Sequence, residues 1–347
     1  MRIRTVRSDD LPALSALWDA CGRRGDVLWL PLDTAAFADK FLSGEGRDPE
    51  YLLVAEAPEG IAGMIHGVAP GSFRGGKPGW AYLSCLLTAP DFRRQGVAGA
   101  LLAALEEKVR AAGAEVLAVS SLNPVNLSWR IPDTPGHDHN NMPGVDDCCE
   151  GAGFFPRMGF APRHHEVAMY LPLAGWRISP RIGELRQRLA EQGIEAGPYD
   201  AGLDCDFDRM CDRVGSDYWR DVLRTEIAAW KAGEPNADAR FWADGVRPRD
   251  PRTLLTAVHD RYIVGFTGPV DRQRSGRGWF TGICTDPEYG QRGIATVLFS
   301  LLMQAFAEEG AAFSTLFTGT ENPAQKIYLA AGMRPVRSFT LMTKDLR

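Results

Sequence analysis

The chain has 347 residues and a formal net charge of −5, with 39 basic and 44 acidic side chains. This acidic balance argues against a broad nucleic-acid-binding surface. Hydrophobic residues make up 45% of the sequence and charged residues 24%, which is typical of a soluble globular protein long enough for two domains.

The amino-terminal segment and the cysteines bear on the compartment. The opening MRIRTVRSDD is charged and lacks the apolar core of a secretory signal. No stretch approaches the roughly 18 consecutive apolar residues that a membrane-spanning helix requires. The seven cysteines are an odd number without a C-x-x-C pair, which favours a reducing environment. We therefore expect a cytoplasmic protein that binds neither membranes nor nucleic acids.

The first half of the chain reads as a series of strands that leads to a glycine-containing loop. Residues 52–67 predict a strand, a tight turn and a second strand, and residues 81–87 predict a third strand. The loop DFRRQG follows, and then leucines at helical spacing end at Gly113, a usual position for a helix C-cap residue. Residues 114–120 predict the next strand.

The second half repeats this order. Residues 254–268 predict a strand pair, 279–285 a third strand, 313–319 the strand after the helix, and Gly310 lies where Gly113 does. Shifting the sequence by 197 positions aligns the two loops and their helices over many identical or similar residues. The aligned pairs include Thr88 with Thr285, Pro90 with Pro287, Gly96 with Gly293, Ala98 with Ala295, Leu101 with Leu298 and Leu105 with Leu302.

Each half is therefore predicted as β-β-β-loop-α-β-α-β preceded by helices, an α/β domain with a mixed, mostly antiparallel sheet flanked by helices. We expect a first domain over 1–173, a connector over 174–193 that includes a helical stretch, and a second domain over 194–347. The segment 217–230 predicts a helix with an apolar face. Its residues are Tyr218, Trp219, Val222, Leu223, Ile227 and Trp230.

The repeated loop has the chemistry of an anion site. A glycine-containing loop between a strand and a helix presents backbone N–H groups at the positive end of the helix dipole, which suits a phosphate. Neither copy has the Gly-Lys-Ser/Thr of a P-loop or the G-x-G-x-x-G of a dinucleotide fingerprint. An ordinary strand-to-helix turn is the alternative, and the second copy of the loop weighs against it.

The pattern Arg93-x-x-Gly96-x-Ala98 resembles the acyl-CoA loop of the GNAT acetyltransferase superfamily. In the second half, TENPAQKIYLAAGM resembles that family's Asn-x-x-Ala-x-x-x-Tyr-x-x-x-Gly run through Asn322, Tyr328 and Gly332, with the first gap one residue shorter. The resemblance covers nearly the whole chain as a tandem pair of GNAT-like domains and is weak over residues 174–250.

The resemblance implies acetyl-CoA, or another acyl-CoA, as co-substrate. The pantetheine arm is expected along the third strand of a half and the pyrophosphate on the loop that follows. In the first half these residues are Leu86, Leu87, Thr88, Arg93, Arg94, Gln95, Gly96, Val97, Ala98 and Gly99. In the second half they are Ile283, Cys284, Thr285, Gln291, Arg292, Gly293, Ile294, Ala295 and Thr296, with Asn322 on the coenzyme arm.

The resemblance also implies direct transfer of an acyl group, most simply acetyl, to the amine of a small molecule. Tyr328 resembles the family's general acid, whereas Phe155 occupies the corresponding place in the first half and has no proton to donate. Gly290 departs from the family's usual Arg or Gln. We expect catalysis in the second half, with Tyr328 as the catalytic residue and Glu321, Glu288 or a water chain as the base.

Several alternatives stay open at this point. The first half could hold the active site, the chain could bind acyl-CoA without turnover as a regulatory protein, or it could be a structural pseudo-dimer with one inactive half and binding in only one cleft. Tyr328 could also be a buried tyrosine that packs the sheet. The chain is expected to be a monomer with internal pseudo-symmetry or a homodimer.

The insertion at 124–154 contains His137, Asp138, His139, Cys148 and Cys149, but their spacing matches no known zinc pattern. We expect no metal, and a loop over the first cleft instead.

Overall fold

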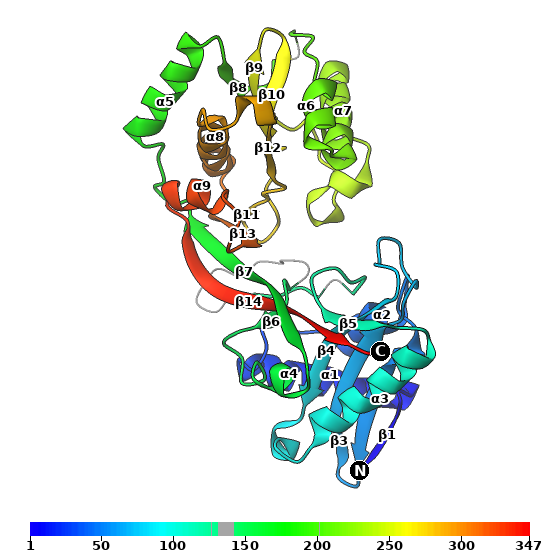
Figure 1. Cartoon of the computed structure of the whole chain (residues 1–347). Helices are drawn as coiled ribbons and strands as arrows, with labels where there is room; N and C mark the ends of the chain where they lie inside the picture. The colour runs from blue at the N-terminus through cyan, green and yellow to red at the C-terminus, as the bar shows by residue number, and fades with distance from the viewer. Residues whose placement is uncertain (126, 131–141, 201) are drawn as a thin grey trace. The chain divides into compact units, whose positions relative to one another are not determined.

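The computed structural model describes residues 1–125, 127–130, 142–200 and 202–347 (Figure 1). Its internal contacts divide the chain into two units: unit 1 comprises Met1–Val167 and Val336–Arg347, and unit 2 comprises Ala168–Pro335. These units are defined by contacts within the structure. The domain boundaries 1–173, 174–193 and 194–347 were drawn from the sequence repeat and stay predictions.

Unit 1 is a sheet with strand order β1-β2-β3-β4-β5-β14, and the short β6 pairs with β14. Neighbouring strands are antiparallel except β4 and β5, which are parallel. The first part of β7 and most of β14 belong to this unit. Its elements are β1 (Arg2–Thr5), α1 (Leu11–Arg23), α2 (Thr34–Leu42), β2 (Leu52–Ala57), β3 (Gly60–Val68), β4 (Trp80–Thr88), α3 (Val97–Ala111), β5 (Val116–Val119), β6 (Val145–Asp146), α4 (Phe154–Arg157), β7 (Ala161–Pro172) and β14 (Arg334–Asp345).

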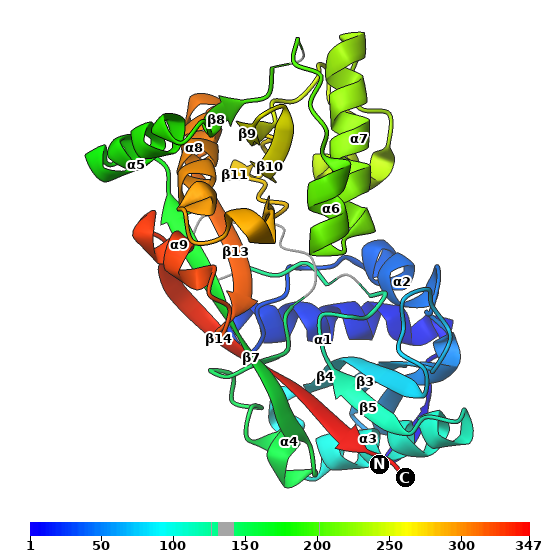
Figure 2. The same cartoon turned by 45° about the horizontal axis from the view of Figure 1, so that its top comes forward.

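Helices cover both faces of the unit 1 sheet, with α1 and α3 on opposite sides (Figure 2). Leu101, Leu105 and Val109 of α3 are fully buried on the strands, as their helical spacing predicted. The helix approaches β3 closely at Gly63, where a Cβ atom would lie 3.1 Å from Cγ1 of Val97. Gly265 of β10 (Tyr262–Thr267) lies equally close to α8 (Ile294–Glu308), where a Cβ would lie 2.8 Å from Cγ2 of Ile294. The structural equivalence of these two glycines follows the predicted repeat.

A bulge in β4 opens the sheet of unit 1. His66 pairs with Cys85 and Gly67 with Leu83, so Ser84 is the extra residue of the bulge. The parallel pairing of β4 with β5 runs from Trp80 to Tyr82 and is not continued beyond that residue in the described ladder. Among the described residues, the backbone groups of β4 beyond Tyr82 on the side of β5 are therefore free to form other hydrogen bonds.

Unit 2 contains a four-stranded antiparallel sheet with order β12-β10-β9-β8, and β13 lies between β7 and β11. Helix α8 packs on β8, β9, β10 and β12, and α6 packs on β10 and β12 from the other side (Figure 1). The remaining elements are α5 (Pro180–Glu191), β8 (Glu195–Pro198), α6 (Asp208–Val214), α7 (Asp217–Ala232), β9 (Leu255–His259), β10 (Tyr262–Thr267), β11 (Arg277–Gly278), β12 (Ile283–Thr285), α8 (Ile294–Glu308), β13 (Phe313–Gly319) and α9 (Gln325–Ala330).

One predicted strand is shorter than expected. The strand expected over 279–285 is regular only over Ile283–Thr285. Gly282 has a φ of 140° and lies under Trp219 of α7, so the backbone there cannot follow an extended ladder. The apolar face of α7 forms as predicted around Val222, Leu223 and Ile227, whereas Tyr218 is half exposed.

The last strand of the chain belongs to unit 1. Lys344 Nζ of β14 donates to Glu106 Oε1 of α3 at 2.6 Å, and the Arg337 guanidinium forms two hydrogen bonds to Asp146 of β6. Because both carboxylates are almost fully buried, these pairs fix β14 against α3 and β6. The first unit is thus completed by residues from the far end of the sequence.

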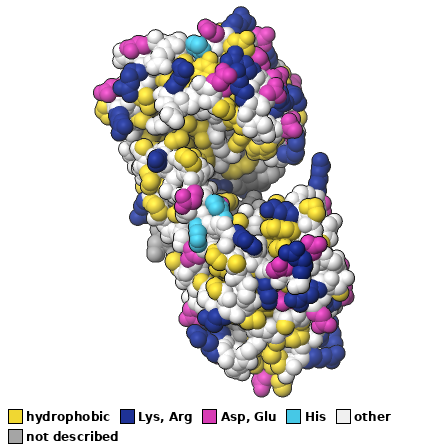
Figure 3. All heavy atoms as spheres, viewed as in Figure 1, with side chains coloured by type: hydrophobic (Ala, Val, Ile, Leu, Met, Phe, Trp, Pro, Cys, Tyr) yellow, Lys and Arg dark blue, Asp and Glu magenta, His cyan; other side chains and the backbone are white. Residues whose placement is uncertain are grey.

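The charged side chains and the cysteines are distributed through both units. Basic and acidic side chains are interspersed over the visible face of each unit (Figure 3). All seven cysteines are free. Within the described part of the chain, no helix has the length and apolar character needed to cross a membrane.

Candidate functional site

The loop before α3 has an open backbone with free N–H groups. Gly96 is the N-cap residue of α3 with φ 81° and ψ 0°, and Arg94 also has a positive φ of 60°. No side chain caps the helix, so the first N–H groups of α3 remain available. Gly96 is exposed, and a Cβ atom at this position would have no neighbour within 4 Å. Such a loop can accept an anion at the positive end of the helix.

The loop before α8 repeats this backbone. Gly293 is the N-cap residue of α8 with φ 88° and ψ 10°, and Gln291 has a φ of 63° at the position of Arg94. The environment differs, however, because a Cβ on Gly293 would lie 2.8 Å from Cδ2 of Leu185, a residue of α5. The two loops have the same conformation, but only the first is open at its N-cap glycine.

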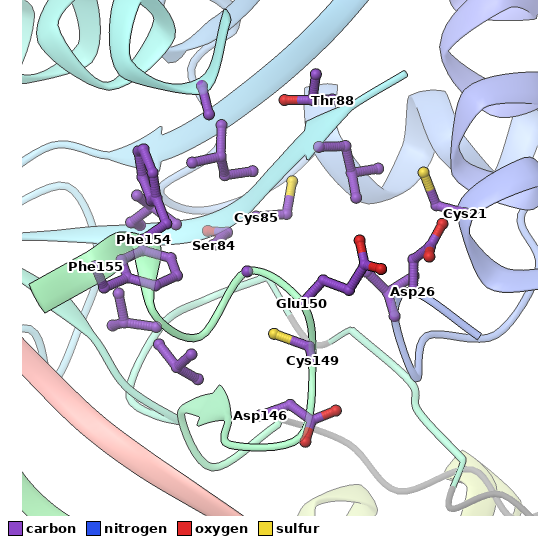
Figure 4. Close-up of a pocket in the computed structure, with 18 of the residues that line it drawn as sticks. Cys21, Asp26, Ser84, Cys85, Thr88, Asp146, Cys149, Glu150, Phe154 and Phe155 are labelled. Atoms are coloured by element: carbon purple, nitrogen blue, oxygen red, sulfur yellow. The ribbon is translucent and has the colours of Figure 1, made fainter. Parts of the chain in front are cut away.

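A cavity of about 350 Å³ in unit 1 joins the open loop to the splayed part of β4 (Figure 4). One wall is the coenzyme loop expected from the sequence, together with Leu86–Thr88 of β4. Phe154 and Phe155 of α4 line the side near Ser84, as the close-up shows. Of the predicted first-half coenzyme residues, the cavity brings together all but Gln95. The predicted residues that line the cavity are Leu86, Leu87, Thr88, Arg93, Arg94, Gly96, Val97, Ala98 and Gly99.

The described parts of the 124–154 insertion also line this cavity, as expected for a loop over the first cleft. Val125, Leu127, Met142 and the segment 144–146 contribute, followed by 149–151. Residues 26–29, which follow α1, also line the cavity, and Trp29 forms an antiparallel bridge with Trp129 of the insertion. The lining away from the phosphate loop is largely apolar, with Trp29 stacked on Trp18 at 4.5 Å between ring centroids. This wall suits the body of a small organic acceptor.

Arg93 joins the loop before α3 to two carboxylates of the cavity lining. Its Nη2 donates to Asp26 Oδ2 at 2.6 Å and its Nη1 to Glu150 Oε2 at 3.2 Å. The carboxylates of Asp26 and Glu150 extend toward one another in Figure 4. Burial by itself would raise the pKa of the Asp26 carboxyl, but the hydrogen bonds and charges of Arg93 and Arg24 outweigh it and lower this pKa. The Asp26 carboxylate is therefore ionised and paired with Arg93. The Arg93 side chain thus holds Asp26 and Glu150 to the loop before α3.

The thiols in the cavity are not set up as nucleophiles. Burial raises the pKa of Cys85 strongly, and it also raises the pKa values of Cys21 and Cys149. Because the thiolate is the reactive form, these cysteines act as small apolar wall groups at neutral pH.

The expected second-half site residues have other contacts. Tyr328 on α9 is 5% exposed and packs against Phe299 and Phe280 at 4.9 and 5.8 Å between ring centroids. Burial raises the pKa of its phenol to about 12. The side chain of Asn322 donates to Thr318 Oγ1 and accepts from the Ala324 amide, so it holds the turn before α9.

The remaining predicted residues of the second half are distributed around the second loop. Ile283, Cys284 and Thr285 form β12 and pair with β10. The Arg292 guanidinium lies 5.1 Å from the centre of the Tyr289 ring. Of the two candidate bases, Glu288 pairs with Arg213 at 2.6 Å, and Glu321 is exposed. The predicted residues therefore form the loop but are not gathered around a described cavity.

The candidate metal ligands all lie in the 124–154 insertion. Groups of three or more His, Cys, Asp and Glu side chains close enough for a metal are not found in the described ranges. His137, Asp138 and His139 lie outside those ranges.

Sequence reasoning missed Asp26, Glu150 and Leu185. Asp26 and Glu150 lie 67 and 57 residues from Arg93, and no local pattern links them. For Leu185 a signal was present, because Ile182, Leu185 and Leu189 follow helical spacing and predict a buried face on α5.

Two segments of the chain match the model of a known protein family. The model of the "Acetyltransferase (GNAT) family" matches residues 12–128 and again 217–333, and each match includes one loop-helix junction. The chain belongs to the GNAT acetyltransferase family. It is an N-acetyltransferase of tandem architecture, and the family uses acetyl-CoA or another acyl-CoA as donor.

Relatives agree with this assignment. An acetyltransferase of Photorhabdus laumondii is 34% identical over 113 residues, which are 33% of this chain and 69% of the relative. A GCN5-related N-acetyltransferase of Sphaerobacter thermophilus shares the fold over 100% of this chain and 96% of its own, with a TM-score of 0.57 at 18% identity. A tandem GNAT protein from the clavulanic acid biosynthesis pathway shares it over 100% and 98%, with a TM-score of 0.52 at 15% identity.

Proposed function

We propose that unit 1 of this tandem GNAT protein binds acetyl-CoA and transfers its acetyl group to the amine of a small molecule. The observation that supports this choice is the unit 1 cavity, which joins an open phosphate-type loop to an unpaired strand edge. The expectation of catalysis in the second half rested on Tyr328, whose phenol is buried among aromatic rings.

The residues of unit 1 fit acetyl-CoA at two places. The N–H groups from Arg94 to Gly99 would hold the pyrophosphate, since Gly96 is exposed and no side chain occupies the helix terminus. The free edge of β4 beyond Tyr82 would hold the pantetheine arm by backbone hydrogen bonds near Leu86–Thr88. Acetyl-CoA supplies an activated acyl group as a thioester.

The protein's contribution to the chemistry is positioning and exclusion of water. The amine must arrive uncharged beside the thioester, where the new C–N bond replaces the C–S bond and the amine proton ends on the sulfur. The apolar wall with Trp29 and Leu127 favours the neutral amine because it disfavours an ammonium ion. Phe155 stands where relatives are expected to have a phenol. The departing sulfur can take the proton that the amine loses, because a thiol with a pKa of about 8.5 is mostly protonated at neutral pH.

The proposal is tested by acetyl-CoA calorimetry on Gly96→Glu, with Gly113→Glu as the matched control. The two glycines flank α3, have φ values of 81° and 86°, and have open space at the Cβ position. Both substitutions therefore introduce the same backbone strain, of about 1–2 kcal/mol, and the same charge. Only Gly96→Glu places a carboxylate where a pyrophosphate would bind. We expect it to weaken acetyl-CoA binding by at least about 100-fold, a loss of roughly 3 kcal/mol.

Gly113→Glu should bind acetyl-CoA within about twofold of the native chain. Equal binding by both variants would contradict a coenzyme site in unit 1 and would return the second half, with Tyr328, as the place of chemistry.

A further inference from the structure

The second loop of this chain has the backbone of an anion site but is closed by another segment of the same unit. We infer that helix α5 is an internal cover over the N-terminus of α8, that Leu185 stands where a phosphate would otherwise approach, and that unit 2 takes no coenzyme. The inference goes beyond the proposed function, since it concerns the other unit and would hold whatever unit 1 binds.

The contact is specific to the N-cap glycine. Three side-chain carbons of Leu185 lie 2.8–3.2 Å from the Cβ position of Gly293, whereas the Cβ position of Gly96 has no atom within 4 Å. Because the two loops share their φ and ψ values, the difference comes from α5 and not from the loop. Gly293 is part-buried whereas Gly96 is exposed, and a leucine side chain offers neither charge nor a hydrogen bond to an anion.

Helix α5 is held in this position by its own contacts. Ile182 and Leu189, one turn on either side of Leu185, are buried. Arg186 Nε donates to the carbonyl of Ala196 in β8 at 2.8 Å, and the Ile194 amide donates to the Leu189 carbonyl. Both Figure 1 and Figure 2 show α5 beside α8, to which it is packed. The cover is therefore part of the folded unit.

A second feature of unit 2 agrees with a closed site. The segment 279–282 before β12 corresponds to residues 82–85 of β4 in the 197-residue shift, and aromatic side chains pack against it. Trp219 lies on Gly282, where a Cβ atom would be 2.2 Å from Cη2 of the indole, and Phe280 packs on Tyr328. Aromatic side chains of the protein therefore occupy the space beside Gly282.

The test is amide hydrogen exchange in the free protein and with acetyl-CoA. In the native chain, the amides of Ile294–Thr296 should be protected before any ligand is added and should not change with acetyl-CoA. In Leu185→Ala these amides should exchange about tenfold faster or more, because the side chain that excludes water is gone. Leu185→Met, which keeps a long apolar side chain, should restore native protection. Glu184→Ala, a neighbour exposed on α5, is the matched control and should leave it unchanged.

Two results would overturn the inference that α5 covers the N-terminus of α8. One is acetyl-CoA-dependent protection of Ile294–Thr296 in the native chain, and the other is unchanged exchange there in Leu185→Ala. Failure of acetyl-CoA to protect the amides of Gly96–Gly99 would instead contradict the proposed function of unit 1, so the two failures can be told apart.

Discussion

Arg93 shows how a single side chain can differ in role from what its motif indicates. The sequence pattern places it on the pyrophosphate, yet its guanidinium is enclosed by Asp26 and Glu150. In the proposed function, anion binding rests on the backbone N–H groups around Gly96, and Arg93 holds the loop to Asp26 and Glu150 of the cavity lining. This division explains why a loop without a free arginine, as at Gly290, can keep the same backbone.

The Arg93 contacts predict unequal effects of two neutral substitutions. The Asp26 side chain is 15% exposed and receives the short hydrogen bond, whereas the Glu150 side chain is 76% exposed. Asp26→Asn should lower the free energy of unfolding by about 1–2 kcal/mol, because it leaves a partly buried guanidinium without its main partner. Glu150→Gln should cost less than about 0.5 kcal/mol. Urea unfolding of both variants measures the difference, and equal losses would show that Asp26 does not anchor Arg93.

His66 on β3 predicts a pH dependence of stability. Its ring is fully buried beside Phe41, and burial lowers the pKa of His66 to about 3. The unfolded chain binds a proton below pH of about 6.5 while the folded chain does not, so the free energy of unfolding falls as the pH decreases from 6.5 toward 3. His66→Leu should remove up to about 1.4 kcal/mol per pH unit of that slope. Chemical denaturation at several pH values checks this.

His164, which is exposed on β7, is the control for this experiment. If His164→Gln flattens the slope as much as His66→Leu does, the assignment to the buried ring is incorrect.

At the scale of elements, the repeated strand-loop-helix unit was readable from sequence because it depends on local rules. Gly96 and the leucines of α3 have fixed spacing, and the structure places Gly96 at the helix N-cap and the leucines in the core. The strand over 279–285 was overestimated because its length is decided by Trp219, which comes from a distant helix. The closure of the second loop depends on the tertiary packing of α5, which a residue pattern can suggest but not locate.

Close packing between α3 and β3 predicts opposite effects of two glycine substitutions. A Cβ at Gly63 would lie 2.6 Å from the Leu87 carbonyl oxygen, whereas the Cβ position of Gly99 in α3 is free to 4 Å. Gly63→Ala should lower the free energy of unfolding by about 1–3 kcal/mol through overpacking. Gly99→Ala should raise it by up to about 1 kcal/mol, since alanine favours the helix. Thermal unfolding of both variants measures these changes in stability. A Gly63→Ala variant as stable as the native chain would contradict the close approach at Gly63.

On the scale of the whole molecule, duplication has produced two equal loop backbones in unequal surroundings. Unit 1 combines the open loop with a cavity and takes its last strand, β14, from the far end of the chain. Unit 2 closes its loop with α5 and surrounds Tyr328 with aromatic rings. The family, the tandem order and the position of the two glycine-containing loops could be predicted from sequence. The choice between the halves could not, because it depends on contacts between segments far apart in the chain.

The number of acetyl-CoA molecules bound per chain tests this account most directly. Calorimetric titration of the native protein should give one site, with the coenzyme held in unit 1 and excluded from the loop under Leu185. Two sites per chain would contradict the closed second loop, and a titration without binding would contradict the coenzyme site itself.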